Sequence, residues 1–222
     1  MGKYNVIFDM DGVIFDSERS LMDCWIETSV RYGVDKERME RTYIKCIGTN
    51  DNQTREIYES EFLGELGSQQ LNSLWDDSVG LYKSRYSDGL LPVKKGVREI
   101  LSFLKERNII VGIASSSKHE TILRQLDIAG ISDYFSAVVG GDSVKISKPN
   151  PEIYLLACNA LDVAPSETFA IEDSFNGIRA AHAAGMRPVM VPDIVEPDDE
   201  MKSLSEAICG SLVDAMNYLS RQ

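Results

Sequence analysis

The sequence lacks the features that mark several large classes of protein. Its 222 residues include only four cysteines, none of them in a Cys-x-x-Cys pair, and only two histidines. Widely spaced cysteines favour neither a zinc site nor a disulfide framework, and free thiols are expected of a cytoplasmic protein. No stretch approaches the ~20 consecutive apolar residues that a membrane span requires, and no signal peptide precedes the first apolar segment.

Basic residues are also in deficit. The chain has 23 Lys and Arg against 35 Asp and Glu, a formal net charge of −12. Nucleic acids and anionic membranes both attract positive surfaces, so neither is expected as a partner. The absence of Gly-x-Gly-x-x-Gly and Gly-x-x-x-x-Gly-Lys-[Ser/Thr] motifs argues against a dinucleotide or a nucleoside triphosphate. Phosphate binding would therefore need a cation, lysines and backbone N–H groups gathered at one place.

What the sequence does contain is a series of short apolar runs that are typical of buried parallel strands. Five strands are predicted, at residues 4–8, 109–114, 137–139, 168–171 and 188–191. Helix-like stretches separate the last four, at residues 118–126, 151–161 and 175–184. This alternation predicts an α/β fold with three layers, in which an open parallel sheet has helices on both faces. Ligands bind such sheets at the carboxyl ends of the strands.

Residues 17–87 interrupt the alternation. They contain no convincing strand, and their apolar residues keep helical spacing, as Leu21 and Trp25 do at the start of the segment. An all-helical domain inserted after the first strand is the simplest explanation, and we expect it to cap the strand ends. We therefore predict a core domain formed by residues 1–16 and 88–222, and a helical cap domain formed by residues 17–87.

Two of the predicted strands end in paired acids. Asp9 and Asp11 follow the first strand, with Gly12 permitting a sharp turn, and Glu172 and Asp173 follow the fourth. Burying such carboxylates is costly unless a cation or a proton compensates. Carboxylate oxygens from two strand ends are ligands that Mg²⁺ prefers. Alternatively, each pair could cap the turn or the helix that follows it.

A lysine and a run of serines supply complementary groups. Lys148 is followed by Pro149 and lies near the start of a predicted helix, where its charge could pair with a phosphoryl group and a nucleophile. Ser115 ends the second strand and could donate a hydrogen bond to a phosphoryl oxygen. Taken singly, Lys148 could equally be a surface lysine, and the serines could be a helix cap.

The order and spacing of these groups carry more information than any one of them. The set resembles the four motifs of the haloacid dehalogenase-like superfamily, and the resemblance covers the whole chain: Asp9-Met10-Asp11-Gly12, Ser115, Lys148-Pro149 and Glu172-Asp173. The helical insertion and Asp16-Ser17-Glu18 resemble the subgroup with a helical cap, which includes β-phosphoglucomutase and many sugar-phosphate phosphatases. The resemblance implies a Rossmann-like core.

The resemblance also implies a phosphatase that acts on a small phosphorylated metabolite, with sugar phosphates as the expected substrates. Asp9 would attack phosphorus and form an aspartyl phosphate, while Asp11 would protonate the leaving group and then activate water. Ser115 and Lys148 would hold the phosphoryl group, and Ser116 would bind substrate. Because a halide leaving group needs no proton, an acid at position 11 favours phosphoryl transfer over dehalogenation.

Magnesium is the cofactor that the resemblance implies. The carboxylates of Asp9 and Asp173 and the backbone carbonyl of Asp11 would bind it. Glu172 would stand beside these ligands or contact the ion through water. We expect the protein to be a monomer, although the sequence leaves oligomers open.

The choice between phosphatase and phosphomutase depends on the helical insertion. β-Phosphoglucomutase has a histidine soon after the first motif and an arginine after a loop glycine, at positions that correspond here to Leu21 and Asp51. A carboxylate would repel the distal phosphate that the arginine binds. A phosphatase is therefore predicted, with a phosphomutase or a non-catalytic phosphate-binding protein as alternatives. Gly48, Asn50, Asp51 and Leu21 are the candidates for recognising the leaving group.

Overall fold

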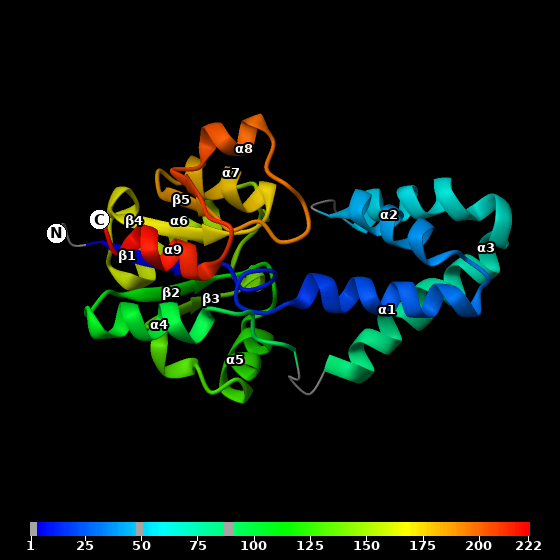
Figure 1. Cartoon of the computed structure of the whole chain (residues 1–222), viewed down its shortest axis with the longest axis horizontal. Coiled ribbons are helices and arrows are strands. Elements are labelled where there is room, and N and C mark those ends of the chain that lie inside the picture. The colour runs from blue at the N-terminus through cyan, green and yellow to red at the C-terminus, as the bar shows by residue number, and fades with distance from the viewer. Residues whose placement is uncertain (1–3, 48–50, 87–90) are drawn as a thin grey trace. The chain divides into compact units, whose positions relative to one another are not determined.

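The computed structural model describes residues 4–47, 51–86 and 91–222, without the side chains of residues 51 and 52 (Figure 1). The chain divides into two compact units, one formed by Met1–Asp16 with Pro92–Gln222 and the other by Ser17–Leu91. The sequence predicts boundaries after residues 16 and 87, and the second of these lies outside the described residues.

A parallel sheet forms the centre of the first unit. Among the described residues it has six strands, in the order β3-β2-β1-β4-β5-β6. The strands are β1 (Asn5–Phe8), β2 (Val111–Ala114), β3 (Ala137–Val139), β4 (Thr168–Glu172), β5 (Arg187–Met190) and β6 (Ala207–Ile208). The predicted α/β class with a parallel sheet is confirmed. β6 is not among the predicted strands, because two residues at a sheet edge carry no periodic pattern.

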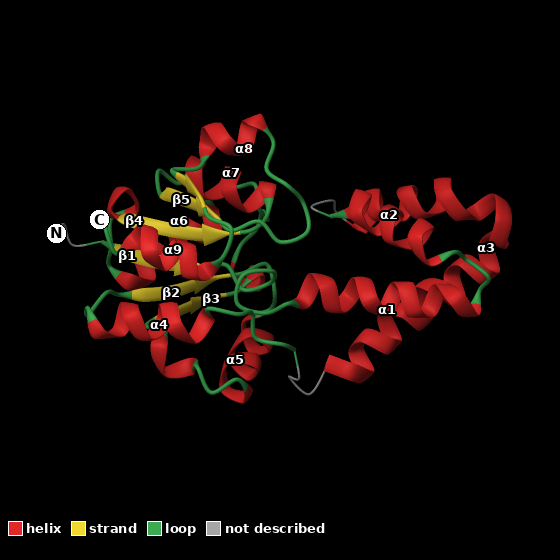
Figure 2. Cartoon of the chain, viewed as in Figure 1, coloured by secondary structure: helices red, strands yellow, loops and turns green. Residues whose placement is uncertain are grey.

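Helices flank this sheet on both faces (Figure 2). Those of the first unit are α4 (Val97–Glu106), α5 (His119–Ile128), α6 (Glu152–Leu161), α7 (Phe175–Ala183), α8 (Asp199–Leu204) and α9 (Leu212–Leu219). Successive strand residues point to opposite faces. Ile7 packs on the face covered by α6 and α7, whereas the ring of Phe8 meets that of Phe135. Phe169 likewise contacts Tyr218 of α9.

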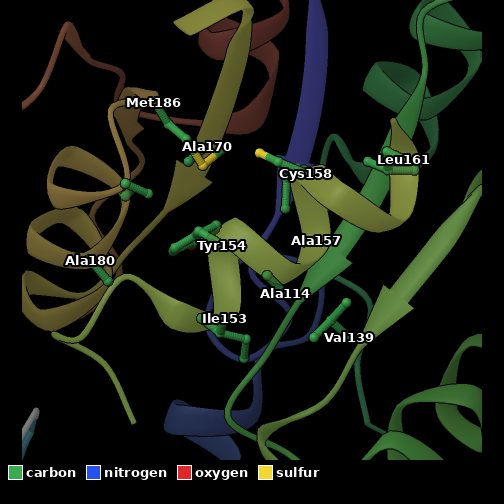
Figure 3. Close-up of a cluster of buried hydrophobic side chains, with 13 residues drawn as sticks. Ala114, Val139, Ile153, Tyr154, Ala157, Cys158, Leu161, Ala170, Ala180 and Met186 are labelled. Atoms are coloured by element: carbon green, nitrogen blue, oxygen red, sulfur yellow. The ribbon is translucent and has the colours of Figure 1, made fainter. Parts of the chain in front are cut away.

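The core between α6, α7 and the sheet is built largely from small side chains (Figure 3). Its buried members are Ile7, Ala114, Val139, Ile153, Tyr154, Ala157, Cys158, Leu161, Ala170, Ala180, Ala181, Ala184 and Met186. Alanines allow helices to approach the strands closely, and such tight packing leaves little room for movement. Tyr154 is the large polar member of the cluster, and it is completely buried. Its hydroxyl must therefore find a partner inside the protein.

The second unit is helical, as the sequence analysis expected of this segment. It contains α1 (Ser17–Arg31), α2 (Lys36–Cys46) and α3 (Asp51–Tyr86). α3 is broken at Gly67, where φ is 69° and ψ is 166°, a conformation that favours glycine. Trp25 is buried against the rings of Tyr58 and Trp75, with centroids 4.5 and 5.2 Å away. No helix within the described ranges is long and apolar enough to cross a membrane.

Candidate active site

The sheet register brings the predicted site residues of the first unit to one edge. Phe8 pairs with Ile113 on one side and with Ile171 on the other, so the residues that follow all three emerge side by side. The backbone N–H of Asp9 continues this pattern by donating to the carbonyl of Ile171, at 2.9 Å. The side chains that follow β1, β2 and β4 therefore share a single site at the carboxyl ends of the strands.

Lys148 lies at the centre of this site and is 7% exposed. Its Nζ donates to Oδ1 of Asp9 and to Oε1 of Glu172, both at 2.6 Å, and to the carbonyl of Ala114 at 3.1 Å. Burial opposes the charge on this ammonium, but the two carboxylates outweigh burial and raise the pKa of Lys148. Lys148 is therefore a buried cation fixed by three acceptors.

Glu172 is completely buried, and donors from the protein occupy both of its oxygens. Oε1 accepts from Lys148 and from the hydroxyl of Tyr154 at 2.7 Å. Oε2 accepts from the backbone N–H groups of Asp173 and Ser174, and from the hydroxyl of Ser174 at 3.0 Å. The same Ser174 hydroxyl accepts from the N–H of Gly177 and so caps α7. Glu172 thus ties Lys148 to the start of α7.

Two of these contacts were not found from the sequence. Tyr154 is separated from Glu172 by 18 residues, and the sequence predicts only that it lies on a helix, which does not reveal the partner of its hydroxyl. Gly177 lies against the carboxyl group of Glu172, and an added Cβ would overlap that group. A glycine inside a helix is a weak signal, because its reason becomes visible only in three dimensions.

Three acids gather closely enough to hold a metal ion. Asp9, Glu172 and Asp173 can each offer one carboxylate oxygen such that all three atoms lie within 4.8 Å of one another. Gly12, at φ 80°, makes room for the carboxylate of Asp173, which a Cβ at this position would overlap. This close set of hard oxygen donors suits Mg²⁺.

The electrostatics of Asp9 agree with a cation site. Burial raises the pKa of Asp9, Lys148 lowers it, and the nearby Glu172 and Asp11 raise it further, so that the net direction is upward. One ammonium among several acids leaves an excess of negative charge that a divalent cation would offset. Both oxygens of Glu172 already accept hydrogen bonds from several protein donors, so Glu172 fits the role of a direct ligand poorly.

Asp11 lies on the same edge and contacts the serine turn after β2. Oδ2 of Asp11 accepts from the hydroxyl of Ser117 at 2.8 Å and from the hydroxyl of Ser115 at 3.3 Å. Ser115 also accepts from the N–H of Ser117, at 3.0 Å. Ser116, between them, is exposed. Ser115, which was expected to contact a phosphoryl oxygen, thus contacts Asp11 here, and Ser117 was not among the predicted site residues.

The predicted residues of the helical insertion are less defined. Gly48 and Asn50 lie outside the described residues, and the side chain of Asp51 is likewise not described. Leu21 lies half-buried on α1 in the second unit. Their assignment to recognition of the leaving group stays a prediction.

A parallel sheet with a buried lysine and converging acids at its carboxyl edge defines an α/β enzyme whose site is built from strand ends. More specifically, the chain belongs to the haloacid dehalogenase-like hydrolases, because the model of this family matches residues 6–191. The family resemblance inferred from the motifs is confirmed.

The relatives of this chain include proteins named as phosphatases and a protein named as a phosphomutase. The chain is 32% identical over 215 residues to a phosphorylated carbohydrates phosphatase of Thermotoga maritima, covering 97% of this chain and 96% of that protein. It is also 32% identical over 191 residues to a β-phosphoglucomutase of Bacillus subtilis, covering 84% and 82%. In fold it is similar to the crystal structure of a HAD family hydrolase of Deinococcus radiodurans, with a TM-score of 0.83 over 99% of this chain and 96% of that one, at 20% identity.

Proposed function

We propose that this protein is a magnesium-dependent phosphatase that hydrolyses sugar phosphates through an aspartyl phosphate on Asp9. The observation that carries the proposal is the buried Lys148 ammonium, 2.6 Å from Asp9, within a cluster of acids at the strand ends. This pairing brings a carboxylate nucleophile and a fixed positive charge to one place. The Thermotoga relative, named as a phosphatase of phosphorylated carbohydrates, supports the substrate class.

The proposed reaction has two halves. The carboxylate of Asp9 attacks phosphorus, the bond from phosphorus to the ester oxygen breaks, and Asp11 gives its proton to that oxygen. Water then attacks phosphorus, gives a proton to Asp11, and the bond from phosphorus to Asp9 breaks. Each half leaves Asp11 in the protonation state that the next half requires. Lys148 offsets the negative charge of the phosphoryl oxygens throughout.

Asp9, Asp173 and the backbone carbonyl of Asp11 are the proposed holders of Mg²⁺. When bound, the ion supplies further positive charge to the phosphoryl oxygens. Glu172 has a different task in this scheme, because it keeps Lys148 within reach of Asp9 while its second oxygen anchors the turn into α7.

A phosphomutase is the second candidate, and the name of the Bacillus relative is the observation that favours it. Leu21 and Asp51 weigh against it, since the mutase would need a histidine and an arginine at these positions. Leucine lacks the polar ring nitrogens of histidine, and a carboxylate would repel a distal phosphate. For these two reasons we place hydrolysis first.

The test is release of inorganic phosphate from a panel of phosphorylated sugars, with Mg²⁺ and with a chelator, for the wild type and for Asp9→Asn. We expect turnover only by the wild type with Mg²⁺, and the mass of one phosphoryl group on the Asp9 peptide after rapid quenching. Full activity of Asp9→Asn would overturn the proposal. If β-glucose 1-phosphate, supplied with the bisphosphate of glucose, were converted to glucose 6-phosphate faster than inorganic phosphate was released, we would assign the protein as a phosphomutase.

A further inference from the structure

We propose that Ser117 is a positioning residue for Asp11, and that it sets which leaving groups the enzyme can expel. This inference rests on the proposed function, in which Asp11 delivers a proton to the leaving oxygen. Ser117 lies outside the four family motifs. The inference depends on the hydrogen bonds of the turn after β2.

The two oxygens of Asp11 have different surroundings. Oδ2 accepts from the hydroxyls of Ser117 and Ser115, at 2.8 and 3.3 Å. Within the part of the chain that the structure describes, no hydrogen bond reaches Oδ1. The two serine hydroxyls therefore fix the orientation of the Asp11 carboxyl group, with Oδ2 turned toward the serine turn and Oδ1 left as the oxygen that can meet the leaving group.

Ser117 is itself held in place by the neighbouring turn. Its carbonyl accepts from the N–H of Gly141 at 2.8 Å, and its N–H donates to the hydroxyl of Ser115 at 3.0 Å. Gly141 lies so close to the backbone of Ser116 that an added Cβ would overlap it. Oδ1 of Asp142 in the same short turn accepts from the N–H of His119 at the start of α5. These contacts fix the backbone of Ser117, and so they fix the position from which its hydroxyl donates to Asp11.

Such positioning matters only when the leaving group needs a proton. An alkoxide is a poor leaving group and gains from a general acid by about 10²–10⁴-fold, whereas a nitrophenolate leaves without one. Loss of the Ser117 hydroxyl should therefore slow the hydrolysis of alkyl phosphates, the class that contains sugar phosphates. The hydrolysis of activated aryl phosphates should change little. A residue that only maintained the fold, or only contacted the phosphoryl group, would affect both classes by one common factor.

The experiment measures kcat/KM for a series of similar size, 4-nitrophenyl, phenyl and benzyl phosphate, at saturating Mg²⁺. The proteins are the wild type, Ser117→Ala and Ser117→Thr, with Ser143→Ala, an exposed serine next to Asp142, as the matched control. For Ser117→Ala we expect kcat/KM to fall about 10- to 100-fold with benzyl phosphate and less than about 2-fold with 4-nitrophenyl phosphate. Only the hydrolysis of benzyl phosphate requires the general acid. Threonine, which keeps the hydroxyl, should restore most of the loss.

Each other outcome overturns the inference. An equal loss across the series assigns Ser117 to phosphoryl binding or to folding, which thermal unfolding of the same variants separates. No loss at all means that the hydroxyl does not position Asp11. Failure of the proposed function has a different signature, because the wild type would then release no phosphate from any of the three esters.

Discussion

The hydroxyl of Tyr154 donates a 2.7 Å hydrogen bond to Oε1 of Glu172, and both side chains are completely buried. Burial and the adjacent Glu172 raise the pKa of Tyr154, so its hydroxyl remains a donor. Lys148 shares the same acceptor oxygen, and its Nζ lies 4.9 Å from the centre of the Tyr154 ring. A residue of the hydrophobic core thus contributes to the charge arrangement at the strand ends.

Tyr154→Phe tests this link. We expect a loss of about 1–2 kcal/mol in the free energy of unfolding, because Glu172 loses a buried donor. We also expect kcat to fall roughly tenfold, since Lys148 would shift relative to Asp9. Denaturant titration and steady-state kinetics measure the two effects. Tyr32→Phe is the control, because that hydroxyl donates to Asp77 at the surface, also at 2.8 Å, and its removal should change neither quantity appreciably.

Gly177→Ala tests how tightly α7 is packed against Glu172. The new Cβ would overlap the carboxyl group of Glu172, and we expect a destabilisation of about 1–3 kcal/mol. Gly80→Ala in α3 is the matched control, since open space surrounds that glycine. There alanine should stabilise the protein by up to ~1 kcal/mol through helix propensity alone. Equal effects of the two substitutions, measured by thermal unfolding, would contradict the close packing of Gly177.

Magnesium should stabilise the folded protein even without substrate. A ligand at 100 times its Kd that binds only the native state adds about 2.7 kcal/mol. We expect the Tm to rise as Mg²⁺ is added, to return when a chelator follows, and to be insensitive to Mg²⁺ in Asp173→Asn. Asp127→Asn, an exposed acid on α5, should keep the full response. A Tm shift that survives in Asp173→Asn would place the ion elsewhere.

Glu206 should make stability depend on pH in the acid range. Hydrogen bonds from Arg187, at 2.7 and 2.5 Å, lower the pKa of Glu206 in the folded state despite partial burial. A lowered folded pKa contributes stability above the unfolded value of about 4.3, and this contribution is lost as pH falls through the folded value. Wild type should therefore exceed Glu206→Gln in stability near neutral pH, and the difference should shrink with acidification. Denaturant titrations across this range measure it, and a constant difference would contradict the linkage.

The sequence predicted the parts of the fold that have a distinct local pattern, such as short apolar runs followed by acidic residues. Short apolar runs predicted five of the strands, and the acids at the carboxyl ends of β1 and β4 marked that edge of the sheet, because parallel strands place their ends together. The location of Lys148 followed from its family motif. The pairing of Lys148 with Glu172 could not follow, since the sequence does not reveal which buried groups share an acceptor.

The misses have physical causes. β6 is too short to show a period. In the sequence, Ser117 cannot be distinguished from a serine that caps a helix, and only the structure places it beside Asp11. The side chain of Tyr154 counts as hydrophobic in any pattern, although its hydroxyl completes the shell of Glu172. Such assignments need the distance between atoms, which periodicity and composition do not contain.

The position of β1 has a consequence for biosynthesis. This strand lies between β2 and β4, and both partners are encoded after the helical unit. During translation, β1 therefore leaves the ribosome long before either partner exists, and its apolar residues must wait unpaired while the helical unit is completed. Asp9 cannot meet Glu172 and Asp173 until the fourth strand has emerged, so a nascent chain that stops earlier carries Asp9 without the acids that gather around it in the folded protein.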